Sequence, residues 1–244
     1  MNAVLSAHLL DAWERASAQP PALRAVTLLR VVHSQEPADK LARLSIGQRD
    51  ARLLRLREQI FGPCLNAITT CPACAETLET NFNVTDVCVE STDPAPSALT
   101  LELDGYVVGF RPPQVLDVTT LRPEADLAEN RRQLLERCVL SAQRDDAKIS
   151  ASELPEKIVT AIAAQMAEAD KQADILVGMR CPSCEHHWRA PLDIFSFFWT
   201  ELSAWASRLL RDVHALASAY GWREGDILAL SPMRRQLYLE LIGQ

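Results

Sequence analysis

The sequence predicts an α+β fold, in which mostly helical N- and C-terminal segments surround two short β-hairpins, and a small α/β insertion separates these hairpins. Three observations support this class. Apolar residues recur at helical spacing near both ends, a CPAC motif at residues 71–74 is echoed by CPSC at residues 181–184, and a segment between the motifs alternates between apolar and polar residues. We therefore divide the chain into residues 1–62, residues 63–82 together with 175–192, residues 83–174, and residues 193–244.

The N-terminal segment, residues 1–62, is predicted to be helical because its apolar residues recur at steps of three or four. Pro20 and Pro21 interrupt this pattern, so a helix is expected on either side of them. Ser45 and Gln48 have the spacing of a capping box, which marks the start of a further helix. Gly62 stands where that helix should end, shortly before the first cysteine motif.

Four arginines lie along this last helix, and a nucleic-acid surface is one interpretation of them. The whole chain carries a formal net charge of −7, however, and an acidic chain is a poor general partner for a phosphate backbone. We therefore favour a solvated helix face or an acidic protein partner. The residues concerned are Arg49, Arg52, Arg55 and Arg57.

The two cysteine motifs are the strongest signal in the sequence. A pair of cysteines with two residues between them can hold one Zn²⁺ from a tight turn, and two such turns complete a four-sulfur tetrahedral shell. A closed shell leaves no position for a water molecule, so the metal is expected to hold structure and not to catalyse a reaction. We predict one structural zinc ion with the ligands Cys71, Cys74, Cys181 and Cys184.

The residues after each motif support the pairing of the two motifs. We call each motif with its tight turn a knuckle. Leu78 follows the first knuckle and Trp188 follows the second at the same offset, in segments that alternate like half-buried strands. Two short hairpins that clamp one zinc ion are similar to a zinc ribbon with a long insertion between its halves. Most ribbons have glycine after the second cysteine, where positive φ is often needed, but this chain has Ala75 and Glu185, which leaves the turn type open.

Other uses of the cysteines are less favoured. A disulfide framework suits small secreted proteins, whereas this chain is large, shows no signal peptide and has seven cysteines, an odd number. A thioredoxin-type motif needs a strand-to-helix context and no second copy. His186 and His187 are interpreted as exposed strand residues because four sulfurs already fill the shell. Cys64, Cys88 and Cys138 lack partners at ligand spacing and are expected to be buried small hydrophobic residues.

The insertion, residues 83–174, starts with a turn-rich segment at residues 91–98. Residues 99–111 then read as a β-hairpin, because apolar residues alternate on both sides of Asp104 and Gly105. An Asp-Gly pair suits a two-residue turn in which both central residues have positive φ.

Two helices complete the insertion, at about residues 125–140 and 153–168, and a short strand at residues 173–179 leads into the second knuckle. Asp170 and Asp174 lie four residues apart near the end of the second helix. A cation site is one interpretation of this pair, and a solvated helix terminus is the one that we favour.

The C-terminal segment, residues 193–244, is the second strong signal. Asp193 suits an N-cap, and the apolar positions that follow hold helical spacing over about seven turns. Gly221 is expected to end this long helix. Ser231 and Pro232 supply the cap and the first-turn proline of a last helix.

Most of the aromatic stripe on the long helix is interpreted as ordinary core, and part of it as a surface that docks a partner protein. Arg234 and Arg235 lie in the first turns of the last helix, where the helix dipole does not favour a positive charge. A carboxylate within the chain or an acidic partner could offset this cost, and we favour the carboxylate within the chain. His214 is interpreted as a packing or capping residue. The candidate partner-binding residues are Trp199, Trp205, Tyr220, Trp222, Arg234 and Arg235.

Composition narrows the possible functions. The chain has 244 residues, 48% of them hydrophobic, which is enough for a substantial core. No apolar run reaches the roughly 18 residues of a membrane span, so we expect a soluble, cytoplasmic protein. The sequence has no phosphate-binding glycine loop, nucleophile elbow or HExxH motif. We therefore predict that the protein is not an enzyme and has no small-molecule substrate.

Three segments, taken in order, resemble one known family. They are GQRDARLLRLREQIFGP, CPSCEHHWRAPLDIFSFFW and LLRDVHALASAYGWREGDILALSPMRRQLYL. The chain is similar to the T4-type baseplate or baseplate hub assembly proteins encoded with contractile phage tails and related injection systems. This resemblance implies a structural or chaperone-like part of a phage tail-like particle or of its assembly, with baseplate, spike or tube proteins as partners. Only the four cysteines carry over, as metal ligands.

Three hypotheses follow. The leading one is a non-enzymatic structural or assembly protein that binds other proteins through its helical ends, with zinc setting the placement of the insertion and the C-terminal helices. The alternative is a zinc-ribbon nucleic-acid-binding or regulatory module, which steeply salt-dependent binding to DNA or RNA would identify. The third is a zinc hydrolase, which requires a metal-bound water.

Overall fold

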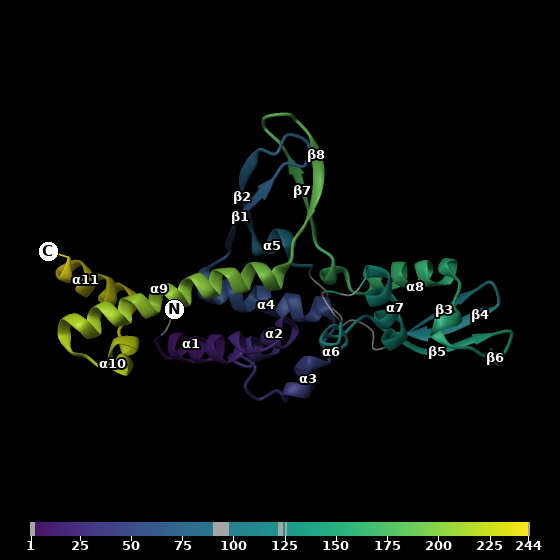
Figure 1. Cartoon of the computed structure of the whole chain (residues 1–244), viewed down its shortest axis with the longest axis horizontal. Helices are drawn as coiled ribbons and strands as arrows, with labels where there is room; N and C mark the ends of the chain where they lie inside the picture. Colours follow the sequence, from purple (N-terminus) through teal and green to yellow (C-terminus); the bar gives the residue numbers. More distant parts are fainter. Residues whose placement is uncertain (1–2, 90–97, 122–123, 125, 244) are drawn as a thin grey trace.

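The computed structural model describes residues 3–89, 98–121, 124 and 126–243. Figure 1 shows an elongated molecule in which a helical centre carries three projecting parts: the C-terminal helices at one end, an α/β unit at the other, and two β-hairpins on one side. The predicted α+β class is confirmed. The turn-rich segment predicted at residues 91–98 lies, except for its last residue, outside the described residues.

The helical centre combines the N-terminal helices with the first half of a long C-terminal helix. Its elements are α1 (Ala3–Ser17), α2 (Pro21–Leu29), α3 (Ala38–Ala42), α4 (Ile46–Phe61) and α9 (Ile194–Tyr220). These helices place their apolar faces against one another, and the fully buried side chains include Leu9, Leu28, Leu53, Phe198 and Leu202. The centre is therefore held together by ordinary hydrophobic burial.

Local signals account for the start and end of α4. The predicted capping box is present: the backbone N–H of Gln48 donates to Ser45 Oγ at 3.2 Å, and that of Ser45 donates to Gln48 Oε1 at 3.1 Å. Gly62 has a φ of 88°, in the left-handed region that favours glycine, and ends the helix. The chain then enters the first hairpin.

The arginines of α4 do not form a solvated face, and this prediction is wrong most clearly for Arg57. Its side chain is buried, and its Nε and Nη2 donate to the two carboxylate oxygens of Glu201 at 2.8 and 2.7 Å. Its Nη1 also donates to the carbonyl of Gly62 at 2.6 Å. Arg49 and Arg52 pair with other carboxylates, and the fourth arginine is exposed. Arg57 thus ties α4 to α9.

The insertion forms a four-stranded antiparallel sheet in the order β3-β4-β5-β6. The strands are β3 (Leu99–Leu103), β4 (Tyr106–Phe110), β5 (Val139–Arg144) and β6 (Ala147–Lys148). The predicted turn is confirmed, because Asp104 and Gly105 have φ values of 52° and 78°. One face of the sheet packs on α8 (Glu156–Ala169) and forms a second core, which includes Val108, Phe110, Ile158 and Ile162.

The first predicted helix of the insertion is shorter than expected. In place of a helix at about residues 125–140, α7 (Leu127–Cys138) ends where β5 begins at Val139. The hairpin of β5 and β6 was not predicted, because Asp145 and Asp146 form its turn with φ values of 47° and 68°, where a glycine is the usual signal. Leu127, the first residue of α7, is exposed although it is apolar.

Asp170 does not lie at a solvated helix terminus, so that prediction is wrong for this residue. Its carboxylate is buried, and its Oδ2 accepts the backbone N–H of Gly47 at 2.9 Å, in the first turn of α4. A Cβ atom on Gly47 would lie 2.0 Å from Asp170 Oδ1, so only glycine fits there. The contact seats η2 (Lys171–Ala173) against α4. Asp174 is exposed, as expected.

Two short helices fill the joints between these parts. They are α5 (Val84–Val87), which follows the first hairpin, and α6 (Val115–Val118), which follows β4. Gln172 is buried beside α5: its side chain accepts the N–H of Val89 at 2.6 Å and donates to the carbonyl of Val87 at 3.1 Å. These contacts join the two ends of the insertion. The N–H of Ile46 donates to the carbonyl of Pro113, and that of Val115 to the carbonyl of Leu44, both at 3.1 Å, which attaches the insertion to the centre.

The C-terminal helices begin and end where the sequence indicated. Asp193 caps α9 by accepting the N–H of Ser196 at 3.0 Å, and Gly221, with a φ of 68°, ends it. After α10 (Glu224–Ala229), Ser231 caps α11 (Pro232–Ile242). No helix in the described residues, α9 included, is long and apolar enough to cross a membrane.

Candidate metal centre

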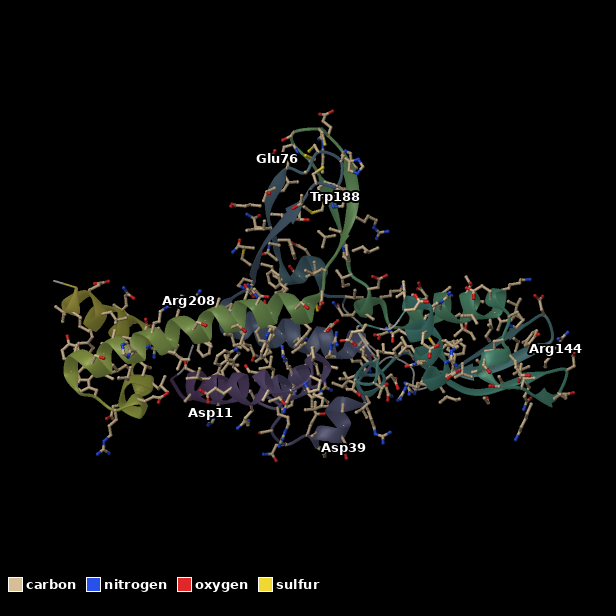
Figure 2. The ribbon with its side chains drawn as sticks, viewed as in Figure 1. Asp11, Asp39, Glu76, Arg144, Trp188 and Arg208 are labelled. Carbon is tan, nitrogen blue, oxygen red and sulfur yellow. The ribbon has the colours of Figure 1, made fainter. Side chains whose placement is uncertain are left out.

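The cysteine motifs lie in the turns of two antiparallel hairpins. The first hairpin is β1 (Cys64–Thr70) with β2 (Thr77–Asn83), and the second is β7 (Leu176–Arg180) with β8 (His187–Pro191). We call these two hairpins the ribbon. Figure 1 shows them projecting together from the helical centre, and Figure 2 shows sulfur atoms near their tip, close to the labelled Trp188.

The two knuckles have the same backbone geometry. In each, the N–H of the first cysteine donates to the carbonyl five residues later, and its carbonyl accepts the N–H four residues later, at 2.9–3.0 Å. The turn type that the sequence left open is the left-handed one, because Ala75 and Glu185 have φ values of 60° and 59°. Neither is glycine, and a non-glycine residue in this conformation costs about 1 kcal/mol.

The hairpins bring all four predicted sulfur atoms together. Cys71 Sγ lies 3.7 Å from Cys184 Sγ, and Cys74 Sγ lies 3.6 Å from Cys181 Sγ. All four Sγ atoms lie within 4.8 Å of one another. A tetrahedral Zn²⁺ with sulfurs at about 2.3 Å has edges of about 3.8 Å, so this arrangement is the size of a zinc–sulfur shell.

The sulfur cluster has little other packing around it. Cys71 and Cys181 are buried with Leu78, and Trp188 packs against them, whereas the second cysteine of each knuckle is exposed. His186 and His187 are exposed, as predicted, and neither belongs to the ligand cluster. The His186 ring instead stacks on Trp188 with the ring centroids 5.9 Å apart.

The thiols of Cys74, Cys181 and Cys184 lie close enough to alter one another's pKa values through hydrogen bonds. The backbone N–H of Glu76 lowers the pKa of Cys74, but hydrogen bonds with the neighbouring thiols and burial raise it to about 12. Burial raises the pKa of Cys181, but the N–H groups of Cys184 and Ser183 and the thiol of Cys74 lower it to about 7. These contacts favour the thiolate at Cys181 and disfavour it at Cys74 and Cys184. A bound cation would stabilise thiolates that are this close together.

The backbone donors to the sulfurs are a part of the site that motif spacing did not identify. They include the N–H groups of Glu76, Ser183, Cys184 and His186, which follow from the knuckle conformation and not from side-chain type. Because any residue except proline supplies such an N–H group, side-chain identity carries little signal for them.

The three cysteines outside the knuckles differ in burial. Cys138 is buried, and burial raises the pKa of its thiol to about 12, as expected for a small hydrophobic residue. Cys88 is half-buried. Cys64 is exposed at the start of β1, so the prediction of a buried residue is wrong there.

The candidate partner-binding residues fall into two groups. Trp199 and Trp205 are half-buried and pack against the cores of the helical centre, and the Arg24 guanidinium lies 4.9 Å from the centroid of Trp199. Tyr220 and Trp222 lie at the far end of α9 and stack with their ring centroids 4.7 Å apart. The structure thus separates residues that belong to the core from residues at the C-terminal end.

The two neighbouring arginines of α11 also differ. Arg234 is exposed, whereas Arg235 is buried and donates from Nη1 to the carbonyl of Leu230 at 3.0 Å. Burial lowers the pKa of Arg235, and the charge of Asp212 opposes this shift. Arg235 is therefore an internal residue near a carboxylate, which agrees with the favoured expectation. His214 is exposed on α9.

Comparison with known proteins gives one match. No curated protein and no solved structure matches the chain. The model of a protein family described as T4 bacteriophage base plate protein matches residues 14–199, a segment that contains both knuckles and most of the helical centre. Since this match covers more than half of the chain, the protein belongs to the T4 bacteriophage base plate family.

Proposed function

We propose that this protein is a non-enzymatic structural or assembly component of a contractile tail or injection-system baseplate, which acts by binding other proteins and contains one structural Zn²⁺. The observation that carries the proposal is the family match over residues 14–199, which includes all four cysteines. The size of the sulfur cluster supports the choice of zinc, because its short edges of 3.6 and 3.7 Å suit a tetrahedral shell.

Zinc would join two hairpins that are far apart in the sequence. Its ligands would be Cys71 and Cys74 from the first knuckle and Cys181 and Cys184 from the second. Bound there, the metal supplies cohesion and a fixed geometry to a ribbon that has little apolar core. Closing such a long loop also reduces the freedom of the unfolded chain, which adds to stability.

A structural role for the ion follows from its ligand set. Four thiolates fill a tetrahedral shell, so no position remains for a water or a substrate. The nearest imidazole, His186, stacks on Trp188 and is not one of the clustered ligands. These features favour a closed structural site over a zinc hydrolase.

We also propose the following division of labour. The ribbon, residues 63–82 with 175–192, fixes where the insertion at residues 83–174 leaves and re-enters the helical centre. Residues 1–62 and 193–244 present the surfaces that other proteins bind. The separate hydrophobic cores of the sheet unit and of the helical centre support this division.

The nucleic-acid alternative is less well supported. The arginines that motivated it are largely engaged, since Arg57 is buried against Glu201, and Arg49 and Arg52 form ion pairs. Guanidinium groups held in such pairs are poorly placed to bind phosphates.

Deletion and complementation in a host that expresses the complete tail gene cluster test this function. Deletion of this protein should give tail tubes without baseplates in electron micrographs, and the wild-type chain should restore complete particles. Mass spectrometry of purified particles then distinguishes a permanent component, which is present, from an assembly factor, which is absent. Normal particles from the deletion strain would contradict the proposal.

A further inference from the structure

The outer face of α11 carries a line of apolar side chains that nothing in the described residues covers. Met233, Leu237 and Leu241 are 75%, 51% and 59% exposed, respectively. They lie at steps of four along the helix, so they share one face over a length of about 12 Å. We call these three residues the α11 ridge. An exposed apolar line of this kind is typical of a binding surface.

The opposite face of α11 fixes the helix to the rest of the chain. Tyr238 packs against Trp222 and Tyr220, with ring centroids 4.8 and 5.7 Å apart, and Arg235 is buried beneath the first turn. The ridge is therefore presented by an ordered helix at one end of the molecule, as Figure 1 shows. A surface formed before binding loses little conformational entropy when a partner docks.

The charges beside the ridge indicate what kind of partner it takes. Arg208 and Arg211 on α9 and Arg234 on α11 are exposed, and no carboxylate in the described residues lies within ion-pair distance of any of them. We call these residues the arginine cluster; Figure 2 shows Arg208 on α9 between α11 and the ribbon. The half-buried Asp212 interacts electrostatically with Arg235, Arg211 and Arg208, so these three arginines lie near one carboxylate. Four arginines, Arg235 included, thus stand against the two carboxylates of Asp212 and Glu240 on these parts of α9 and α11, although the whole chain has a formal net charge of −7.

A second copy of this chain is a poor occupant for the ridge. Its α11 could supply apolar side chains, but Glu240 is the only carboxylate on that helix. A pair of α11 helices would therefore offer one carboxylate for the three arginines of each copy. Nucleic acid would neutralise the arginines but leave the apolar ridge in water. An amphipathic helix with acidic flanks satisfies both features, because helices pack apolar stripes against each other in this way.

We propose that the α11 ridge and the arginine cluster together bind an amphipathic helix of another protein, whose apolar stripe covers the ridge and whose flanks carry carboxylates. The proposal rests on the protein-binding function proposed above and adds the site and the chemistry of one partner. The site lies beyond residue 199, where the family match ends, so the match does not assign it.

A peptide-binding assay on the full chain tests the proposal. The probes are a stapled amphipathic helix with a leucine stripe and glutamate flanks, and the same helix with lysine flanks. The acidic probe should bind at least about tenfold more tightly, a difference that should shrink as salt rises. Leu237→Lys should weaken its binding by about tenfold or more, because a charge would enter the apolar contact.

A matched control separates the ridge from exposed apolar residues in general. Leu127→Lys alters a side chain that is 81% exposed on α7, in the insertion, and should leave binding unchanged. Circular dichroism and zinc content should match the wild type for both variants. Equal binding of the two probes, or wild-type affinity in Leu237→Lys, would overturn the proposal. DNA binding that survives Leu237→Lys, without binding of the acidic probe, would overturn it as well.

Two further measurements separate this proposal from the general function. Sedimentation should show a monomer for both the wild type and Leu237→Lys. A wild-type dimer that Leu237→Lys abolishes would overturn the proposal, because the occupant of the ridge would then be a second copy of the chain. In the complementation assay, Leu237→Lys should fail to restore particles, whereas Leu127→Lys should restore them. Full rescue by Leu237→Lys would remove the ridge proposal and leave the baseplate function intact, whereas a deletion without effect would contradict the function itself.

Discussion

The ribbon and the helical centre adjoin each other but are held together by different forces. The centre buries a large set of apolar side chains from five helices, among them Leu9, Leu53 and Phe198. The buried cluster of the ribbon consists of Cys71, Leu78 and Cys181. Burial contributes about 25 cal/mol per Å² of apolar surface, so the centre can be stable by itself and the ribbon cannot. We therefore expect a metal held by the four sulfurs to stabilise the ribbon and to contribute little to the stability of the centre.

A partly buried ion pair lies within the helical centre, in the two helices from which the ribbon emerges. The helix α4 leads into β1, and β8 leads into α9. Arg57 and Glu201 therefore join the two helices that carry the hairpins. This contact does not depend on the metal. We therefore predict that loss of zinc unfolds the hairpins while α4 and α9 stay packed against each other.

The largest expected effect comes from removing a zinc ligand. Cys181→Ser should abolish stoichiometric zinc binding and unfold the ribbon, because metal binding contributes on the order of 10 kcal/mol to the folding of small zinc modules. Limited proteolysis should then cut within the hairpins before it cuts the helices. Zinc content by elemental mass spectrometry and peptide mapping provide the measurements.

Cys64→Ser is the matched control for this variant, because Cys64 is an exposed cysteine at the foot of the same ribbon and lies outside the sulfur cluster. It should keep one zinc ion per chain and the wild-type protease pattern. Zinc retention by Cys181→Ser at the wild-type level would remove the proposed role of the site.

A cavity in the helical centre should have the opposite signature. Phe198 is fully buried, so Phe198→Ala should lower the free energy of unfolding by about 3–5 kcal/mol. Because Phe198 does not touch the sulfur cluster, the zinc content should remain unchanged. Calorimetry and elemental analysis on the same sample test this; zinc lost in proportion to stability would show that the two regions are not separate.

The contact between the insertion and the centre is expected to be weaker. Gly47→Ala places a Cβ atom 2.0 Å from Asp170 Oδ1, and relief of this clash should cost about 1–3 kcal/mol. Gly225→Ala is the control, since a Cβ atom at that position has no neighbour within 4 Å. Urea unfolding should show destabilisation by the first change alone, and equal stability of the two variants would contradict the packing described.

Thiol reactivity should distinguish cysteines that are protected by burial from those that a metal protects, without a change in the sequence. Burial and the charge of Asp117 raise the pKa of Cys138 to about 12, so at pH 8 roughly one molecule in ten thousand carries its thiolate. Raising the pH towards 12 increases that fraction. Mass spectrometry after alkylation should therefore find Cys64 modified and Cys138 protected, and the four clustered cysteines modified once zinc is removed by a chelator. Rapid modification of Cys138 in the folded protein would contradict its burial.

Much of the fold follows from local sequence signals. The capping box at Ser45, the Asp104-Gly105 turn and the cap of α9 at Asp193 are formed by a few neighbouring residues, so their outcome depends little on distant contacts. The same holds for the knuckles, whose spacing sets the turn. The grouping of the four sulfurs could also be predicted, because only a second knuckle completes the shell of the first.

The remaining features depend on contacts between distant segments. Arg57 lies four residues after Leu53 and three before Ile60, on the buried face of α4, but its partner Glu201 is far away in the sequence. The burial of Asp170 depends on Gly47 in the same way. Residue type alone favours an exposed position for each of these charged side chains. A charged residue on the apolar stripe of a helix was the one available signal.

The most direct test of the proposed four-cysteine zinc site is the X-ray absorption spectrum of the purified chain at the zinc edge. We predict one zinc ion per chain with four sulfur neighbours at about 2.3 Å and no nitrogen or oxygen ligand. A shell that contains nitrogen or oxygen, or a zinc content far below one ion per chain, would contradict it.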